Sequence, residues 1–186
     1  MIEDIINVLS DVVSSDQSHI KLWQLVLHVL ESAFQNDNDG KAPQDPEPHT
    51  NVLQGYYQVT TRFLPLSRLL VDQLSHTGAV NLDTYFIPAI VELAATTNSI
   101  SQHKDLNSRI LMCARSSETG VRRAAIKCQR AITDRLGEEW LTLLPEMLPV
   151  IGELQEDEDE IVEEETLAWI QRIEDIVGES LDTMLQ

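Results

Sequence analysis

Two stretches, "VRRAAIKCQRAITDRLGEEW" at residues 121–140 and "VEEETLAWIQRIEDIVGESL" at residues 162–181, decide how this chain folds. They carry the same pattern at an offset of 41 residues. The apolar positions that coincide recur every three or four residues, which is the spacing of one face of an α-helix. In both stretches this face is followed by a glycine. The coincident positions are Val121 with Val162, Ala125 with Thr166, Cys128 with Trp169, Ile132 with Ile173 and Leu136 with Val177.

Gly137 and Gly178 are predicted to end the two helices, because glycine readily takes the left-handed conformation that closes a helix. A new amphipathic segment follows each glycine. The unit of a helix, a glycine stop and a second helix therefore recurs every 41 residues, which is the length of a HEAT or armadillo repeat. Prolines near the start of apolar segments recur too, at Pro65, Pro88 and Pro149. The sequence therefore predicts an all-α fold, an α-solenoid of about four HEAT-like antiparallel helix pairs in one domain.

The hydrophobic pattern also predicts where the remaining helices and one long loop lie. Residues 35–51 contain three prolines, one glycine and no large apolar side chain, so this segment is expected to be a solvated, disordered loop. The single domain is expected to span residues 1–186, with the clearest repeats in residues 80–186. The expected helices span residues 1–14, 20–34, 52–74, 82–96, 107–115, 118–136, 138–154 and 159–177.

The net charge of −18 is unevenly distributed along the chain. Residues 99–137 contain eight Lys and Arg against three acids, whereas residues 138–186 contain sixteen Asp and Glu against the single basic residue Arg172. So negative a chain repels a phosphate backbone, which disfavours nucleic-acid binding by the protein as a whole. Two isolated cysteines, Cys113 and Cys128, indicate free thiols in a reducing compartment. No signal-peptide layout and no apolar run of about 20 residues is found, so no membrane association is expected.

The most acidic segment, "QEDEDEIVEEE" at residues 155–165, is predicted to be a turn between two helices and the first turns of the second helix. Negative charge is favourable at that end of the helix dipole. Glu163, Glu164 and Glu165 are expected to face mostly water. A turn does not need this many like charges, and we therefore predict that they form a docking surface for a basic protein. The alternative is that they only keep this face of the protein soluble. This acidic ridge comprises Glu156, Asp157, Glu158, Asp159, Glu160, Glu163 and Glu164.

A basic patch precedes it. Arg123, Lys127 and Arg130 share one helix face, with Arg122 beside them. Such a patch could contact RNA phosphates or an acidic protein segment. Few aromatic residues lie nearby, which argues against stacking of single-stranded bases. The alternative is a surface helix paired with acids of a neighbouring helix, such as Glu138, Glu139 or the segment 156–165.

No catalytic, metal-binding or cofactor motif emerges from the sequence. An EF-hand loop that began at Asp157 would require an oxygen ligand at Ile161 and a glycine at Val162, so the pattern fails. No GxSxG, P-loop or GxGxxG motif occurs. We therefore expect no enzymatic activity, no catalytic or metal site, no cofactor and no small-molecule substrate. The histidines His19, His28, His49, His76 and His103 show no zinc-type spacing with each other or with the cysteines.

The C-terminal part of the sequence resembles a known family. "LGEEWLTLLPEMLP" (136–149), the acidic turn and "GESLDTMLQ" (178–186) are similar to the C-terminal region of the large HEAT-repeat subunit of the small-subunit processome in fungi. This is the BP-twenty-eight or U-three small-nucleolar-RNA-associated protein ten family. Residues 80–186 carry the resemblance, and the first 75 residues follow more loosely. The resemblance implies a C-terminal piece of a much longer, non-catalytic protein of the nucleus and nucleolus.

What the resemblance implies about function is ribosome biogenesis: early pre-rRNA assembly and processing of small-subunit rRNA within the U-three snoRNP, a ribonucleoprotein, with a link to rDNA transcription. Two classes of function remain. The first is an interaction scaffold that binds other protein subunits of the processome. The second is a module that contacts pre-rRNA or small nucleolar RNA through the basic helix at residues 109–130. A third reading is a transport-receptor-like solenoid that binds basic cargo.

Overall fold

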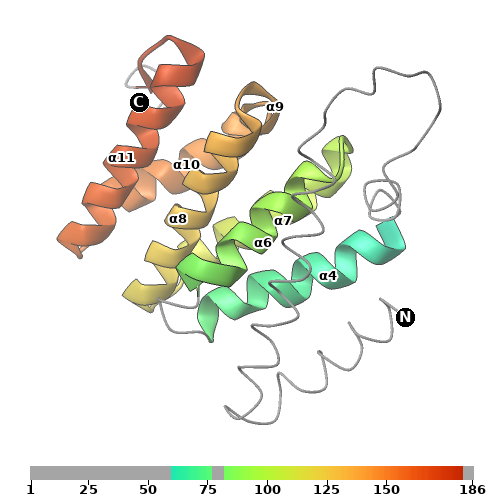
Figure 1. Cartoon of the computed structure of the whole chain (residues 1–186). Helices are drawn as coiled ribbons and strands as arrows, with labels where there is room; N and C mark the ends of the chain where they lie inside the picture. Colours follow the sequence, from blue (N-terminus) through green and yellow to red (C-terminus); the bar gives the residue numbers. More distant parts are fainter. Residues whose placement is uncertain (1–59, 77–81, 182–186) are drawn as a thin grey trace.

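The computed structural model describes residues 60–76 and 82–181, and every helix named below lies within these ranges (Figure 1). Their helical elements follow one another closely, and the described residues contain no β-strand. The all-α prediction is therefore confirmed. In chain order the elements are α4 (Thr60–Asp72), η2 (Gln73–Ser75), η3 (Leu82–Phe86), α6 (Ile87–Ala95), α7 (Ile100–Ala114), α8 (Thr119–Leu136), α9 (Glu138–Leu141), α10 (Leu144–Gln155) and α11 (Glu160–Val177).

The longer helices form two layers that advance in chain order (Figure 1). In one layer α7 packs between α4 and α10, and in the other α8 packs between α6 and α11. Short turns join α7 to α8 and α10 to α11, so these first-layer helices are paired with the next helix in the second layer, and α4 packs against α6 in the same way. This is the arrangement of an α-solenoid, as predicted. The described residues contain three such pairs, and the residues expected to supply a fourth, with the helices at 1–14 and 20–34 and the loop at 35–51, lie outside them.

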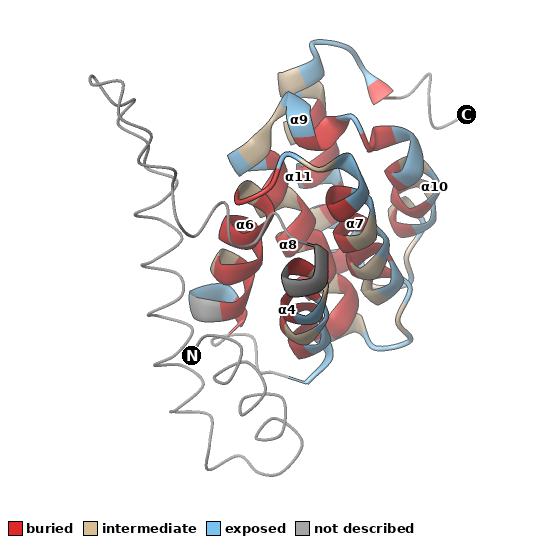
Figure 2. Ribbon diagram, turned by 90° about the vertical axis from the view of Figure 1, so that its right-hand side faces the viewer, coloured by how far each residue is buried: buried red, intermediate tan, exposed pale blue. Residues whose placement is uncertain are grey.

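Four of the five pairs of coincident positions in the two opening stretches are buried in both helices; in the last pair Leu136 is half-buried and Val177 is exposed. Cys128 and Trp169 are 0% exposed, as are Ile132 and Ile173. Figure 2 shows that buried residues lie mainly where helices face one another. The predicted inward orientation of Trp169 is therefore confirmed. Both glycines end their helices with a positive φ that side chains disfavour. Gly178 takes the expected left-handed conformation, with φ 79° and ψ 10°, whereas Gly137, with φ 55° and ψ −129°, does not.

Two helix predictions need correction. The single helix expected at residues 138–154 is broken into α9 and α10 at Thr142 and Leu143, because Pro145 has no N–H to donate and the proline ring disfavours helical backbone just before it. The helix expected at residues 107–115 starts earlier, at Ile100. Its first turns bury the polar side chains of Gln102 and His103, so they carry no apolar pattern.

Other buried polar side chains form hydrogen bonds between helices. The Gln129 side chain on α8 donates to Asn107 of α7 at 2.8 Å and accepts from the Trp140 indole at 3.0 Å. The Trp169 indole of α11 donates to the Thr133 hydroxyl of α8 at 3.2 Å. A one-residue slip of either helix would leave these groups unpaired in the core, so the bonds fix the register of the stack.

Candidate protein-docking surface

The acidic ridge lies where the sequence placed it, in the turn between α10 and α11 and in the first turns of α11. Asp159 is the N-cap of α11, and its carboxylate accepts hydrogen bonds from the amides of Ile161 and Val162 at 3.0 and 3.3 Å. It therefore stabilises the helix start, which limits its use for a partner. The ridge residues whose side chains are exposed are Glu156, Glu158, Glu160, Glu163 and Glu164.

Asp157 also turns away from solvent. Its carboxylate accepts a hydrogen bond from the Arg122 guanidinium at 2.8 Å, and each of these side chains is 9% exposed. Arg122 also donates to the carbonyl oxygens of Ser116 and Ser117 at 3.0 and 3.2 Å. One guanidinium thus ties the α7–α8 turn to the α10–α11 turn of the next pair.

The two turns are built alike. The amide of Glu118 donates to the Ser116 hydroxyl at 3.2 Å, and the amide of Asp159 donates to the Asp157 carboxylate at 3.0 Å. Ser116 and Asp157 are 41 residues apart, so the turns follow the same offset as the helices. Burial alone would raise the pKa of the Asp157 carboxyl, but hydrogen bonds from Arg122 and the Asp159 amide, together with the Arg122 charge, hold that pKa below its usual value.

Most of the basic patch is paired within the fold. Besides Arg122, Arg123 donates to Glu165 of α11 at 3.0 Å, and Lys127 donates to Asp83 of η3 at 3.0 Å. Glu165 is only 18% exposed, so the expectation that it mostly faces water is wrong: Arg123 draws it against α8. Any ligand at these three cations would compete with a carboxylate that is already in place.

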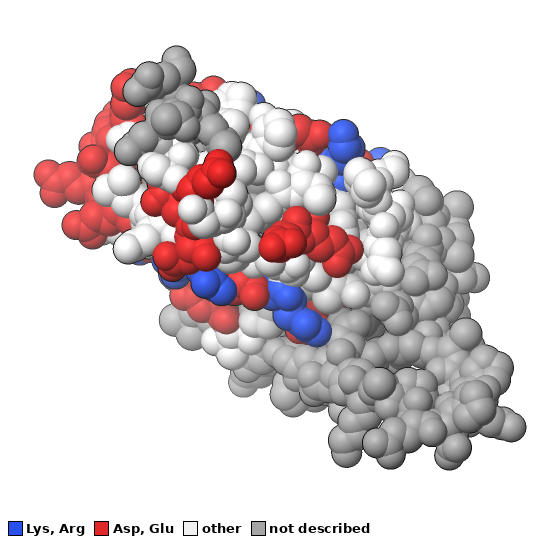
Figure 3. Space-filling model, turned by 90° about the horizontal axis from the view of Figure 1, so that it is seen from above, with Lys and Arg blue, Asp and Glu red and all other residues white. Residues whose placement is uncertain are grey.

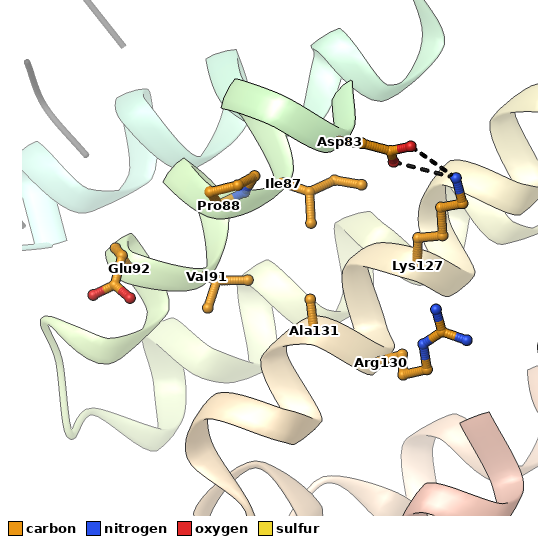
Figure 4. Close-up of a pocket in the computed structure, with 8 residues that line it drawn as sticks. All are labelled: Asp83, Ile87, Pro88, Val91, Glu92, Lys127, Arg130 and Ala131. Atoms are coloured by element: carbon orange, nitrogen blue, oxygen red, sulfur yellow. Dashed lines mark hydrogen bonds and ion pairs between the residues drawn. The ribbon is translucent and has the colours of Figure 1, made fainter. Parts of the chain in front are cut away.

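Arg130 differs from the other three, because no carboxylate of the described residues pairs with it. It is half-buried and lines a groove of about 440 Å³ between α6 and α8. Figure 4 shows Ile87, Val91 and Ala131 along the floor of this groove and the Lys127–Asp83 pair at one end. Of the predicted patch, only this guanidinium is therefore available without breaking an ion pair within the described part of the chain.

Sequence reasoning missed several ion pairs that bridge neighbouring helix pairs. Arg115 binds Glu153 at 2.6 Å, and Arg135 binds Glu92 at 3.2 Å. These partners lie 38 and 43 residues apart in the chain. A separation near the 41-residue offset was the available signal, since residues one repeat apart occupy adjacent positions in a stack.

The exposed acids therefore dominate one end of the described structure. Viewed from above, acidic side chains gather at the left, the side on which α11 lies in Figure 1 (Figure 3). The one basic residue of residues 138–181, Arg172, is paired with Asp134 of α8. The arrangement suits electrostatic binding of a basic partner, because exposed charges of one sign speed and orient the encounter.

A metal site and a reactive thiol each place requirements on the described residues. Within residues 60–76 and 82–181, no group of three or more His, Cys, Asp and Glu side chains is placed to hold a metal. Burial raises the pKa of the Cys128 thiol, so the reactive thiolate is disfavoured. No helix of the described ranges is long and apolar enough to cross a membrane.

The fold and the charge distribution describe an α-solenoid segment with exposed acids gathered at one end, and comparison with known proteins shows what the chain is similar to. No family model matches the chain. The whole chain is, however, 42% identical to U3 small nucleolar RNA-associated protein 10 of Chaetomium globosum, and 42% and 41% identical to the proteins of that name from Neurospora crassa and Pyricularia oryzae. The chain covers 10% of the length of each.

This confirms the resemblance seen in the sequence: over its entire length the chain is homologous to part of the fungal U3 small nucleolar RNA-associated protein 10. The matched segment is the C-terminal region of those longer proteins. Their name describes association with a small nucleolar RNA and specifies no reaction.

Proposed function

We propose that this chain is a non-catalytic interaction domain of a U3 small nucleolar ribonucleoprotein subunit, which docks other protein subunits of the small-subunit processome in the nucleolus. The observation that carries the proposal is similarity along the entire chain to proteins named for U3 small nucleolar RNA. The domain would thereby support early pre-rRNA assembly and processing of small-subunit rRNA, in a complex linked to rDNA transcription.

The geometry favours a protein partner over RNA as the direct contact. Three of the four cations in the basic patch already bind carboxylates, and the net charge of the chain is −18. A phosphate backbone that approached the exposed acids would be repelled. Exposed glutamates that form no ion pair with the described residues instead suit Lys- or Arg-rich segments, which are common in proteins that bind rRNA.

The test reverses charge on the acidic ridge without disturbing the fold. A variant that includes Asp159 is unsuitable, because its carboxylate caps α11. We would therefore replace Glu156, Glu158 and Glu163, which are exposed and for which the structure records no ion pair, with lysine in the full-length fungal protein. The matched control replaces three exposed acids elsewhere, Glu138, Glu139 and Asp175.

Recovery of U3 small nucleolar RNA and of processome proteins with the tagged protein is the measurement. The ridge variant should lose recovery in dilute salt far more than the control, and the difference should shrink as salt rises, because charges are screened over about 8–10 Å near physiological ionic strength. Equal recovery for both variants would show that the ridge only solvates the fold. If Arg130→Ala alone then reduced RNA recovery, the RNA-contacting alternative would take its place.

A further inference from the structure

The second-layer helices are not equally covered by their neighbours. α8 lies between α6 and α11, whereas the main contacts of α11 in the described part of the chain are with α8, α10 and α9 (Figure 1). The side of α11 that points away from α8 is exposed along its length. We call this side the free face of α11, and it comprises Glu160, Glu163, Glu164, Leu167 and Gln171.

The 41-residue offset shows what this face corresponds to. Ile126 of α8 is at the position of Leu167, and it shares a helical stripe with Arg123 and Thr133, which bind Glu165 and Trp169 of α11. Ile126 is therefore on the side of α8 that α11 covers, and it is 1% exposed. Leu167 is 48% exposed. The free face of α11 thus corresponds to the side of α8 that α11 covers, but no helix of the described residues covers it.

The charges on the free face have the opposite sign to those on α8. Arg122 and Arg123 of α8 bind carboxylates of the next helix pair, Asp157 and Glu165. At the same two positions α11 carries Glu163 and Glu164. A helix that packs here as α11 packs on α8 would meet two glutamates in place of two arginines, so it would need basic side chains at the contact.

We propose that the free face of α11 docks an amphipathic α-helix from another protein, whose apolar stripe covers Leu167 and whose flanking lysines or arginines pair with Glu163 and Glu164. The proposal rests on the proposed function, since it names the kind of partner that the docking domain takes. A second copy of the chain is a poor occupant, because the same glutamates would then face each other. RNA is repelled by the same charges.

Two synthetic helical peptides of 20 residues test the proposal with the whole chain. Both have the same leucine stripe; one is flanked by lysines and the other by glutamates. Fluorescence anisotropy in dilute salt measures the Kd of each peptide, and methyl NMR shows where it binds. The basic peptide should bind and shift the Leu167 methyl signals while leaving those of Met112, a 73% exposed methionine on α7, unchanged.

Matched variants separate this face from general attraction between opposite charges. Leu167→Ala and the double change Glu163→Gln with Glu164→Gln should each raise the Kd of the basic peptide about fivefold. The controls should change its Kd less than about twofold, because they alter an exposed methionine or remove two exposed charges elsewhere. These controls are Met112→Ala and the double change Glu138→Gln with Glu139→Gln.

The proposal is overturned if both double variants weaken binding equally, if the acidic peptide binds as tightly, or if the Leu167 methyl signals do not move. It is also overturned if the chain dimerises through this face in sedimentation experiments, or if a 20-nucleotide single-stranded RNA displaces the peptide. The outcome is distinct from that of the proposed function. Loss of processome recovery with the ridge variant and normal recovery with Leu167→Ala would refute the helix-docking face alone.

Discussion

The buried ion pair between Arg122 and Asp157 should contribute several times more to the free energy of unfolding than the exposed ion pairs of this protein do. Asp157→Ala would leave a guanidinium that is 9% exposed without its anionic partner. Breaking a buried pair typically costs 3–5 kcal/mol. Because Arg122 would keep carbonyl acceptors at Ser116 and Ser117, we expect the low end, about 3 kcal/mol of unfolding free energy.

Urea unfolding followed by circular dichroism measures that change. The matched control is Asp134→Ala, which removes a carboxylate that is 51% exposed and pairs α8 with Arg172 of α11. The control should cost less than about 1 kcal/mol, because solvent screens an exposed pair. A double-mutant cycle with Arg122→Met should give a coupling energy of about 2 kcal/mol between Arg122 and Asp157.

The pH dependence gives a second, independent check. The folded-state pKa of Asp157 lies below its unfolded value of about 3.9, so its stabilising contribution is complete above that pH and is lost as the pH falls toward the folded-state pKa. The stability difference between the wild type and Asp157→Asn should therefore stay nearly constant from pH 6 to about pH 5 and shrink as the pH falls through about 4 toward the folded-state pKa. If Asp157→Ala cost no more than Asp134→Ala, or if the difference stayed constant with pH, the ion-pair reasoning would be refuted.

Three further predictions concern the repeat architecture. Trp169→Ala should cost about 3–5 kcal/mol, because the side chain is 0% exposed, and a near-native melting temperature would contradict the 41-residue register. Gly137→Ala should lower the free energy of unfolding by about 1–3 kcal/mol through its positive φ alone, whereas Gly152→Ala inside α10 should raise it by about 0.5–1 kcal/mol. A Cβ added at either glycine would meet open space, so only the backbone conformation differs between the two sites. Equal effects of the two changes in thermal unfolding would refute the backbone argument. Deletion of residues 36–49, which lie outside the described residues, should leave the melting temperature unchanged, and a large drop would show that they pack against the fold.

The sequence by itself determined the helices of the repeat and their ends. α8 and α11 begin within one residue of the predicted positions and end at the predicted residues. This was possible because a buried helical face requires apolar side chains every three or four residues, and a glycine stop is a property of one residue's backbone. Where the buried face is polar, as at Gln102 and His103, the pattern vanished and the start of α7 was missed.

Only the tertiary structure decided which charges are available to a partner. The sequence showed an acidic ridge and a basic patch as separate features, and it left open whether the two meet. In the fold, Arg122 and Arg123 reach Asp157 and Glu165, which lie 35 and 42 residues further along the chain. An ion pair depends on the distance between two side chains in space, and stacking of helix pairs brings residues one repeat apart within hydrogen-bond reach. Glu160, Glu163 and Glu164 of α11 are exposed and form no ion pair with the described residues.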